Sequence, residues 1–185
     1  MENYTKYQLK SNEELASLLE GKDNLYVIAC NKCFKEFDTI DEPDCDEFLK
    51  FAAEQGKTVT GSTKVDFLCN KMHTERKLQD LFPEGTENVI VISCGLGIQT
   101  VAELAGKPVY AASNSLNYRG HHGMALTKKS CDACAQCYLN ITGGVCPIVD
   151  CSKSLVNGQC GGAKNGKCEV DPNKDCAWEK IYQRL

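Results

Sequence analysis

The stretch NVIVISCGLGIQTVAELAGKPVYAAS, residues 88–113, decides the fold class of this chain. It opens with an apolar run that ends at Cys94, continues with a helical pattern from Gly97 to Gly106, and closes with a second apolar run that ends at Ser113. Short continuous apolar runs are typical of strands that are buried on both faces, as in a parallel sheet. The stretch therefore predicts a strand, a crossover helix and a second strand.

The same alternation of strand and helix patterns is found upstream of this stretch. The segments concerned are residues 25–30 (strand), 45–56 (helix), 57–61 (strand) and 71–82 (helix). An additional helix is predicted near the start of the chain, where Ser11 and Glu14 have the spacing of a capping box and Gly21 marks the end. The alternation predicts an α/β domain with a parallel sheet and right-handed crossovers, either Rossmann-like or flavodoxin-like.

Beyond Ser113 the periodic pattern disappears, and residues 113–130 have the composition of a linker. The remaining segment is rich in cysteine, has only short apolar runs and cannot close a large core of its own. A final helix is predicted after Asp175, with one apolar face formed by Trp178, Ile181, Tyr182 and Leu185. We therefore expect a parallel α/β domain over residues 1–115 and a small irregular cysteine-rich domain over residues 116–185.

Charge and hydropathy exclude several classes of protein. The net charge of −4 comes with scattered lysines and arginines, which argues against a nucleic acid partner. The chain has no apolar run of the roughly 18 residues that a membrane span needs, and its first residues lack the pattern of a signal peptide. We therefore expect a cytoplasmic protein with no membrane partner.

Thirteen cysteines dominate the chemistry of the chain, and eight of them fall within the last 55 residues. In a reducing cytosol a disulfide framework is less expected than metal binding. Cys131, Cys134 and Cys137 form a C-x2-C-x2-C run, and Cys146 is followed by Pro147. Such a triplet suits three corners of a cuboidal [4Fe–4S] cluster better than the paired knuckles of a zinc site.

The five later cysteines provide a fourth ligand for this triplet and a complete second set of four. They are Cys146, Cys151, Cys160, Cys168 and Cys176. We therefore expect two [4Fe–4S] clusters in the C-terminal region. The spacing alone leaves open which of these five cysteines joins the triplet.

Four cysteines of the first domain are expected at the carboxyl edge of the sheet, where such folds place their ligands. Cys30 and Cys94 end predicted strands, Cys33 follows Cys30 closely, and Cys69 lies in the loop after the second strand. These four predict a third metal site, holding either [4Fe–4S] or zinc. Cys45, in the middle of a helical pattern, is expected in the core.

The sequence gives no sign of catalytic machinery. Gly95 and Gly97 are followed by Thr100 where a dinucleotide fingerprint needs a third glycine, so a nicotinamide site is not expected. The adjacent His121 and His122 lie in the polar linker and are expected to be solvated. No nucleophile with a neighbouring base is found, and no catalytic residue is predicted.

Several of these motifs resemble one known family. The stretch LVNGQCGGAKNGKCEVDPNKDCAWEKIYQRL, together with CDACAQC, GGVCP and SCGLGIQTVAEL, is similar to the small cysteine-rich subunit that accompanies methylenetetrahydrofolate reductase in acetogenic and related anaerobic bacteria. The resemblance runs from Cys30 to Leu185 and is densest after Cys131. Two positions depart from the family pattern, with Gln159 in place of proline and Phe37 in place of an additional cysteine.

The resemblance implies that this chain is a non-catalytic, electron-delivering subunit. Its partner would be a flavin-containing catalytic subunit of methylenetetrahydrofolate reductase, with further electron-donor proteins upstream. The cysteines that match the family's ligand set are Cys30, Cys33, Cys69 and Cys94 in the first domain and Cys131, Cys134, Cys137, Cys146, Cys151, Cys160, Cys168 and Cys176 in the second. The alternatives are a zinc-bound partner without a redox role and a zinc thiolate that activates a methyl acceptor.

Overall fold

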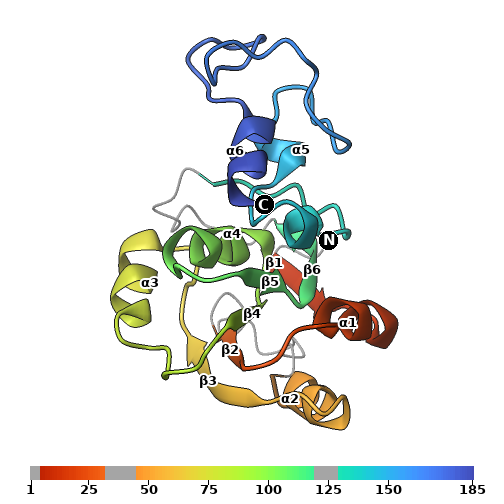
Figure 1. Cartoon of the computed structure of the whole chain (residues 1–185), viewed down its shortest axis with the longest axis vertical. Coiled ribbons are helices and arrows are strands. Elements are labelled where there is room, and N and C mark those ends of the chain that lie inside the picture. The colour runs from red at the N-terminus through yellow and green to blue at the C-terminus, as the bar shows by residue number, and fades with distance from the viewer. Residues whose placement is uncertain (1–4, 32–44, 119–128) are drawn as a thin grey trace.

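The computed structural model describes residues 5–31, 45–118 and 129–185. Helices and strands alternate through the first two ranges, and short helices separated by irregular backbone follow in the third (Figure 1). In chain order the elements are β1 (Thr5–Leu9), α1 (Asn12–Leu19), β2 (Leu25–Cys30), α2 (Cys45–Glu54), β3 (Val59–Val65), α3 (Lys71–Leu78), β4 (Asn88–Ile92), α4 (Gly95–Leu104), β5 (Val109–Ala111), β6 (Ser113–Tyr118), η1 (Tyr138–Ile141), α5 (Pro147–Asp150) and α6 (Ala177–Arg184).

Four parallel strands form the central sheet, in the order β3-β2-β4-β5. The chain starts near the middle with β2, adds β3 on one side, and then crosses to add β4 and β5 on the other side. This is the order of a flavodoxin-like sheet, and it confirms the predicted α/β class. The order reverses between β2 and β4, so the carboxyl ends of these two strands flank the switch point where such sheets bind ligands.

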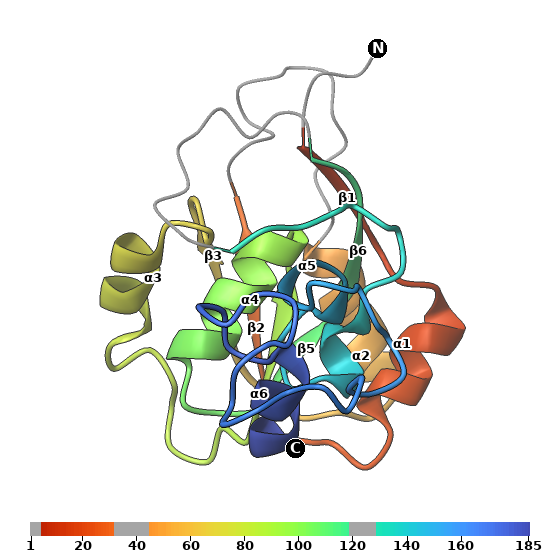
Figure 2. The same cartoon turned by 90° about the horizontal axis from the view of Figure 1, so that it is seen from above.

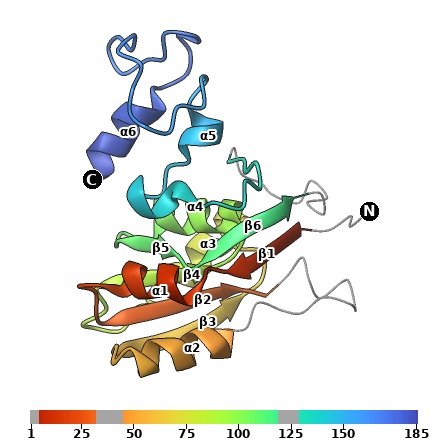
Figure 3. The same cartoon turned by 90° about the vertical axis from the view of Figure 1, so that its right-hand side faces the viewer.

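Helices cover both faces of this sheet, as Figure 3 shows with α2 on one side and α4 on the other. On the first face Phe48 of α2 and Leu15 of α1 pack against Val27 and Ile90. On the second face Ile98 of α4 packs against Ile28 and Val91. Both β2 and β4 are buried on their two faces, which is why their sequences are continuous apolar runs rather than alternating ones.

Local signals in the sequence account for the starts of two helices. The Ser11 hydroxyl accepts a hydrogen bond from the Glu14 amide at 3.2 Å, and the Glu14 carboxylate accepts one from the Ser11 amide at 3.1 Å. This capping box satisfies two amides that the first turn of α1 leaves without helical partners. Asn70 caps α3 in the same way, accepting from the His73 amide at 3.1 Å.

The structure corrects several predicted boundaries, and one error is substantial. Residues 113–118, expected to open a linker, form strand β6, which pairs antiparallel with β1 from Leu9↔Ser113 to Thr5↔Tyr118. The sequences of both strands are mostly polar, so no apolar run marks them. Each strand depends on a partner more than 100 residues away in the sequence, and the local sequence pattern cannot predict such pairing. Smaller corrections are that β3 extends to Val65 and that α3 ends at Leu78 rather than Phe82.

Helix α4 is buried on all sides in its first two turns, from Gly95 to Val101. One side faces the sheet, and loops of the C-terminal segment lie over the other, as the view from above shows (Figure 2). Gly144 lies so close to α4 that an added Cβ would stand 2.3 Å from Ala102 Cβ. This double coverage explains why the sequence of α4 is apolar without a clear polar face.

The C-terminal segment has a small core of its own, formed by Val145, Cys176, Trp178 and Ile181. The Trp178 indole N–H donates to the Leu155 carbonyl at 2.8 Å. The predicted helix is present as α6, but only part of its expected apolar face is buried, because Tyr182 and Leu185 are 51% and 75% exposed. None of the helices in the described ranges has the length and apolar character that crossing a membrane requires.

Candidate metal centres

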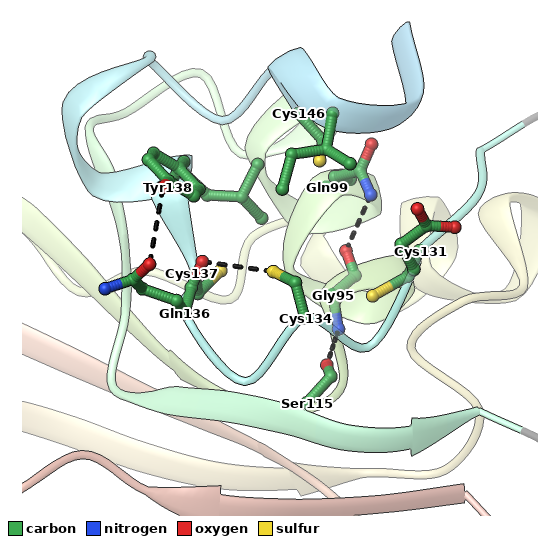
Figure 4. A pocket seen from close by; sticks show the side chains of 12 residues that line it. Gly95, Gln99, Ser115, Cys131, Cys134, Gln136, Cys137, Tyr138 and Cys146 are labelled. Atoms are coloured by element: carbon green, nitrogen blue, oxygen red, sulfur yellow. Dashed lines mark hydrogen bonds between the residues drawn. The ribbon is translucent and has the colours of Figure 1, made fainter. Parts of the chain in front are cut away.

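The eight C-terminal cysteines fall into two groups of four, and each group lines a pocket of its own. The first pocket, drawn in Figure 4, has Cys131, Cys134, Cys137 and Cys146 on its walls. The second has Cys151, Cys160, Cys168 and Cys176. All eight are unbridged thiols. The structure therefore places Cys146, and none of the four later cysteines, beside the triplet, a question that spacing left open.

The loop that carries the triplet is shaped by two alanines in an unusual backbone conformation. Ala133 and Ala135 have positive φ angles of 49° and 57°, which turn the chain sharply between successive cysteines. Strand β6 holds the loop in place. The Ala135 amide donates to the Ser115 carbonyl at 2.9 Å, and the Cys137 amide donates to the Asn114 side-chain oxygen at 3.0 Å.

The first turn of α4 forms the floor of this pocket. The Gly95 amide donates to the Ser115 hydroxyl at 2.8 Å, and a Cβ added to Gly95 would lie 2.7 Å from Cys131 Sγ. Only glycine leaves room for the thiol at this position. Gln99 then ties the loop to the helix, because its amide nitrogen donates to the carbonyls of Ser130 at 2.8 Å and Gly95 at 3.1 Å.

Burial opposes ionisation of the thiols in the first pocket. It raises the pKa of Cys137 to about 12, and it raises the pKa of Cys146 as well, with the neighbouring Cys131 thiol acting in the same direction at both. Metal ligands must be thiolates, so a bound cation would have to supply the charge that holds these sulfurs in their ionised form. The apolar side chains of Leu139 and Ile148 complete the lining.

Short backbone ladders build the second pocket. The Cys168 amide donates to the Lys174 carbonyl and the Cys176 amide to the Gly166 carbonyl, both at 2.8 Å. Cys168 Sγ lies 3.4 Å from Ser152 Oγ. This hydroxyl, together with the backbone amides of Asp171 and Val170, lowers the pKa of Cys168 to about 7. The two pockets therefore differ, since burial raises thiol pKa values in the first, whereas hydrogen bonds lower that of Cys168 in the second.

Three of the four N-terminal cysteines lie where the parallel sheet predicts them, at its carboxyl edge. Cys30 is the last residue of β2, Cys69 follows β3, and Cys94 is the N-cap of α4. Burial raises the pKa of Cys69 to about 12, with Cys94 and Cys30 near enough to raise it further. Cys33 lies outside the described residues, as do Phe37, His121 and His122. Cys45 is buried in the core, as predicted.

Within the described ranges, no three cysteine, histidine or carboxylate side chains stand close enough together to hold a metal ion. Binding would require the thiols around each pocket to turn toward a common centre. The side chains present nevertheless have the chemistry of metal ligands. Each of the two C-terminal pockets is lined by four thiols, and the only lysine or arginine among their lining residues is Lys153, in the second pocket. Four thiols in one pocket fit either a [4Fe–4S] cluster or a tetrahedral zinc ion.

Sequence reasoning missed the residues that position these thiols. In the sequence Gly95 is only part of an incomplete dinucleotide fingerprint, and no sequence signal marks Gln99, Ser115 or Asn114. Their roles depend on contacts between α4, β6 and the cysteine loop, which lie far apart along the chain. Only the apolar character of the first turns of α4 hinted that a second layer covers this helix.

Comparison with known proteins identifies one related family. Residues 110–185 match the family described as methylene-tetrahydrofolate reductase C terminal. The matched segment is less than half of the chain and contains all eight C-terminal cysteines, but not Cys30, Cys69 or Cys94. No curated protein and no solved structure matches the chain. The similarity to this family therefore concerns only the C-terminal part of the chain.

Proposed function

We propose that this chain is the electron-transfer iron–sulfur subunit of a methylenetetrahydrofolate reductase complex, relaying electrons to or from the flavin of a separate catalytic subunit. The observation that carries the proposal is the division of the eight C-terminal cysteines into two groups of four, each around its own pocket. The family match of the same segment supports the link to the reductase. The chain itself needs no catalytic residue for this role.

The residues of the first pocket suit a cluster better than an exposed ion. Cys131, Cys134, Cys137 and Cys146 would supply the four thiolates. A [4Fe–4S] cluster, when bound, takes up and releases one electron at a time without breaking bonds in the protein. Leu139 and Ile148 would limit the access of water to one side of the cluster, and hydrogen bonds to β6 support the loop.

Cys151, Cys160, Cys168 and Cys176 would hold the second cluster. Cys146 and Cys151 flank the four-residue helix α5 as its two caps, so these two cysteines, one from each pocket, are separated along the chain by little more than one helical turn. Cys30, Cys69 and Cys94, with Cys33, remain candidates for a third site that holds [4Fe–4S] or zinc. Neighbouring centres of this kind would allow electrons to move through the chain in single steps.

A zinc-bound partner subunit without a redox role is the alternative. The observation that favours it is the small size of the C-terminal core, a cluster of four buried residues. A segment with so little apolar burial needs cross-links for stability, and structural zinc provides them with the same four thiolates.

Metal analysis of protein purified without oxygen distinguishes the two functions. We expect about eight irons and eight sulfides per chain for two clusters, and an EPR signal that develops on reduction with dithionite. The variants Cys146→Ala and Cys45→Ala provide a paired test, because Cys146 is partly buried and lines the first pocket, whereas Cys45 is buried in the core of the α/β part. Loss of about half the iron is expected for Cys146→Ala and no loss for Cys45→Ala. Zinc without iron in the wild-type chain would contradict electron transfer.

The partner is tested by electron transfer itself. Dithionite-reduced chain, freed of excess reductant, is mixed with the flavin-containing catalytic subunit, and flavin absorbance is followed by stopped flow. Rapid bleaching of the flavin is expected with the wild-type chain. Flavin that stays oxidised in a complex shown to form would contradict the relay and leave a structural role.

A further inference from the structure

Lys10, directly after β1, is a buried cation in a part of the chain with no cysteine. Its side chain is only 6% exposed. The ammonium group donates to Glu14 Oε1 at 3.0 Å and to Asn114 Oδ1 at 2.8 Å. A buried ammonium is costly unless a counter-charge compensates it. The Glu14 side chain is 48% exposed, so water screens this carboxylate more than it screens the ammonium.

Asn114 connects this cation to the first cysteine pocket. The oxygen that accepts from Lys10 also accepts from the Cys137 amide, at 3.0 Å. Both neighbours are donors, so the orientation of the Asn114 amide is fixed by its partners. The Lys10 ammonium nitrogen and the Cys137 amide nitrogen are 2.8 and 3.0 Å from the same Asn114 oxygen, so they lie less than about 6 Å apart. Lys10 and Cys137 also line the same groove between α1 and η1.

We propose that Lys10 is a positioning residue for the site formed by Cys131, Cys134, Cys137 and Cys146, supplying through Asn114 a fixed positive charge that favours the reduced state of this site. The inference rests on the proposed function. A cluster held by four thiolates is anionic and gains a further negative charge on reduction. A nearby buried cation stabilises the more negative state more strongly, so it raises the reduction potential.

The test is a redox titration, followed by EPR, of the full chain purified without oxygen. The signal of the Cys137 site is identified by its loss in Cys137→Ala. At the potential where this site is half reduced in the wild type, Lys10→Met is expected to lower the ratio of reduced to oxidised cluster about tenfold. For a one-electron couple this corresponds to a shift of about 59 mV.

Matched variants separate the charge of Lys10 from its packing. Lys10→Arg keeps the charge and is expected to keep the ratio within about twofold of wild type. Lys50→Met, at an exposed position of α2, changes the net charge equally and is expected to leave the potential unchanged. Glu14→Gln removes the counter-charge and leaves the ammonium, so it is expected to shift the potential in the opposite direction to Lys10→Met.

The possible results separate the role of Lys10 from the proposed electron-transfer function. An unchanged potential in Lys10→Met with full iron content, or shifts of the same sign in Lys10→Met and Glu14→Gln, would overturn the role of Lys10 while electron transfer stands. A wild-type chain without redox-active iron would overturn the proposed function, and the role of Lys10 with it. If Lys10→Met does not fold, the sign of the shift in Glu14→Gln decides the question.

Discussion

The two parts of this molecule are held together by different means. The α/β part has two extensive cores, one on each face of the sheet, with side chains such as Phe48 and Ile90 fully buried. The cysteine-rich part from Val145 onward has one small core around Trp178 and Ile181. The first part has the apolar burial that stabilises an ordinary domain, and the second does not. The second part therefore needs cross-links for stability, and we propose that its thiols provide them by binding metal.

Removal of metal should expose this difference most strongly. Structural thiolate metal sites contribute on the order of 10 kcal/mol or more to folding. After anaerobic chelation we expect the amides of residues 146–185 to lose their protection from hydrogen exchange, while those of β2 and β4 keep theirs. Hydrogen exchange read by mass spectrometry measures both parts in one sample. Equal protection of residues 146–185 with and without metal would show that this segment folds on its own core.

Phe48→Ala tests the opposite half of the comparison. Phe48 of α2 is 0% exposed and packs on the sheet, so its truncation should cost about 3–5 kcal/mol of unfolding free energy. Urea denaturation followed by circular dichroism gives this value. The iron held by the C-terminal cysteines should not change, because α2 lies on the face of the sheet away from the cysteine-rich part (Figure 3). Loss of iron from folded Phe48→Ala would mean that the two parts are energetically coupled.

Two glycines allow a comparison between the junction of the two parts, where Gly95 lies, and the interior of the α/β part, where Gly61 lies. A Cβ at Gly95 would stand 2.7 Å from Cys131 Sγ, and a Cβ at Gly61 would stand 2.7 Å from a ring carbon of Tyr26. Each glycine-to-alanine change should destabilise the chain by about 1–3 kcal/mol through overpacking. Only Gly95→Ala should also reduce the iron held by the first cysteine group. Metal analysis of the two variants checks this, and equal iron in both would show that Cys131 tolerates the displacement.

The smallest expected effect concerns an ion pair of the α/β part. Glu103 of α4 accepts from Lys71 at 2.5 Å and lies 3.3 Å from Lys129 Nζ, and these contacts, led by Lys71, lower its pKa. A carboxyl whose pKa is lower in the folded state adds stability above its unfolded pKa. That contribution is lost as the pH falls through its folded pKa.

At this partly exposed site the contribution should be below about 1 kcal/mol. Glu103→Gln should therefore be slightly less stable than wild type at pH 7, with the difference disappearing at acid pH. Urea denaturation from pH 7 to pH 3 measures the trend. A difference that persists at acid pH would show that the carboxylate charge is not responsible.

The sequence predicted the parts of the structure that local pattern encodes. Strand β2 has the predicted bounds, the capping box of Ser11 is present, and Cys30, Cys69 and Cys94 lie at the predicted edge of the sheet. The strands β1 and β6 were not predicted. Their residues are mostly polar, and the pairing that makes them strands joins the beginning of the α/β part to its end.

The sequence by itself determined the α/β class, because apolar periodicity fixes which segments can bury themselves. For the cysteines it predicts metal binding, because a thiol is a soft ligand wherever it lies. Only the tertiary structure decided that Cys146 belongs with Cys131, Cys134 and Cys137, and that the first turn of α4 leaves space for a sulfur at Gly95. It also decided that Lys10 lies beside Cys137. These contacts join residues that lie far apart in the chain, and the local sequence pattern cannot predict which of them are close in space.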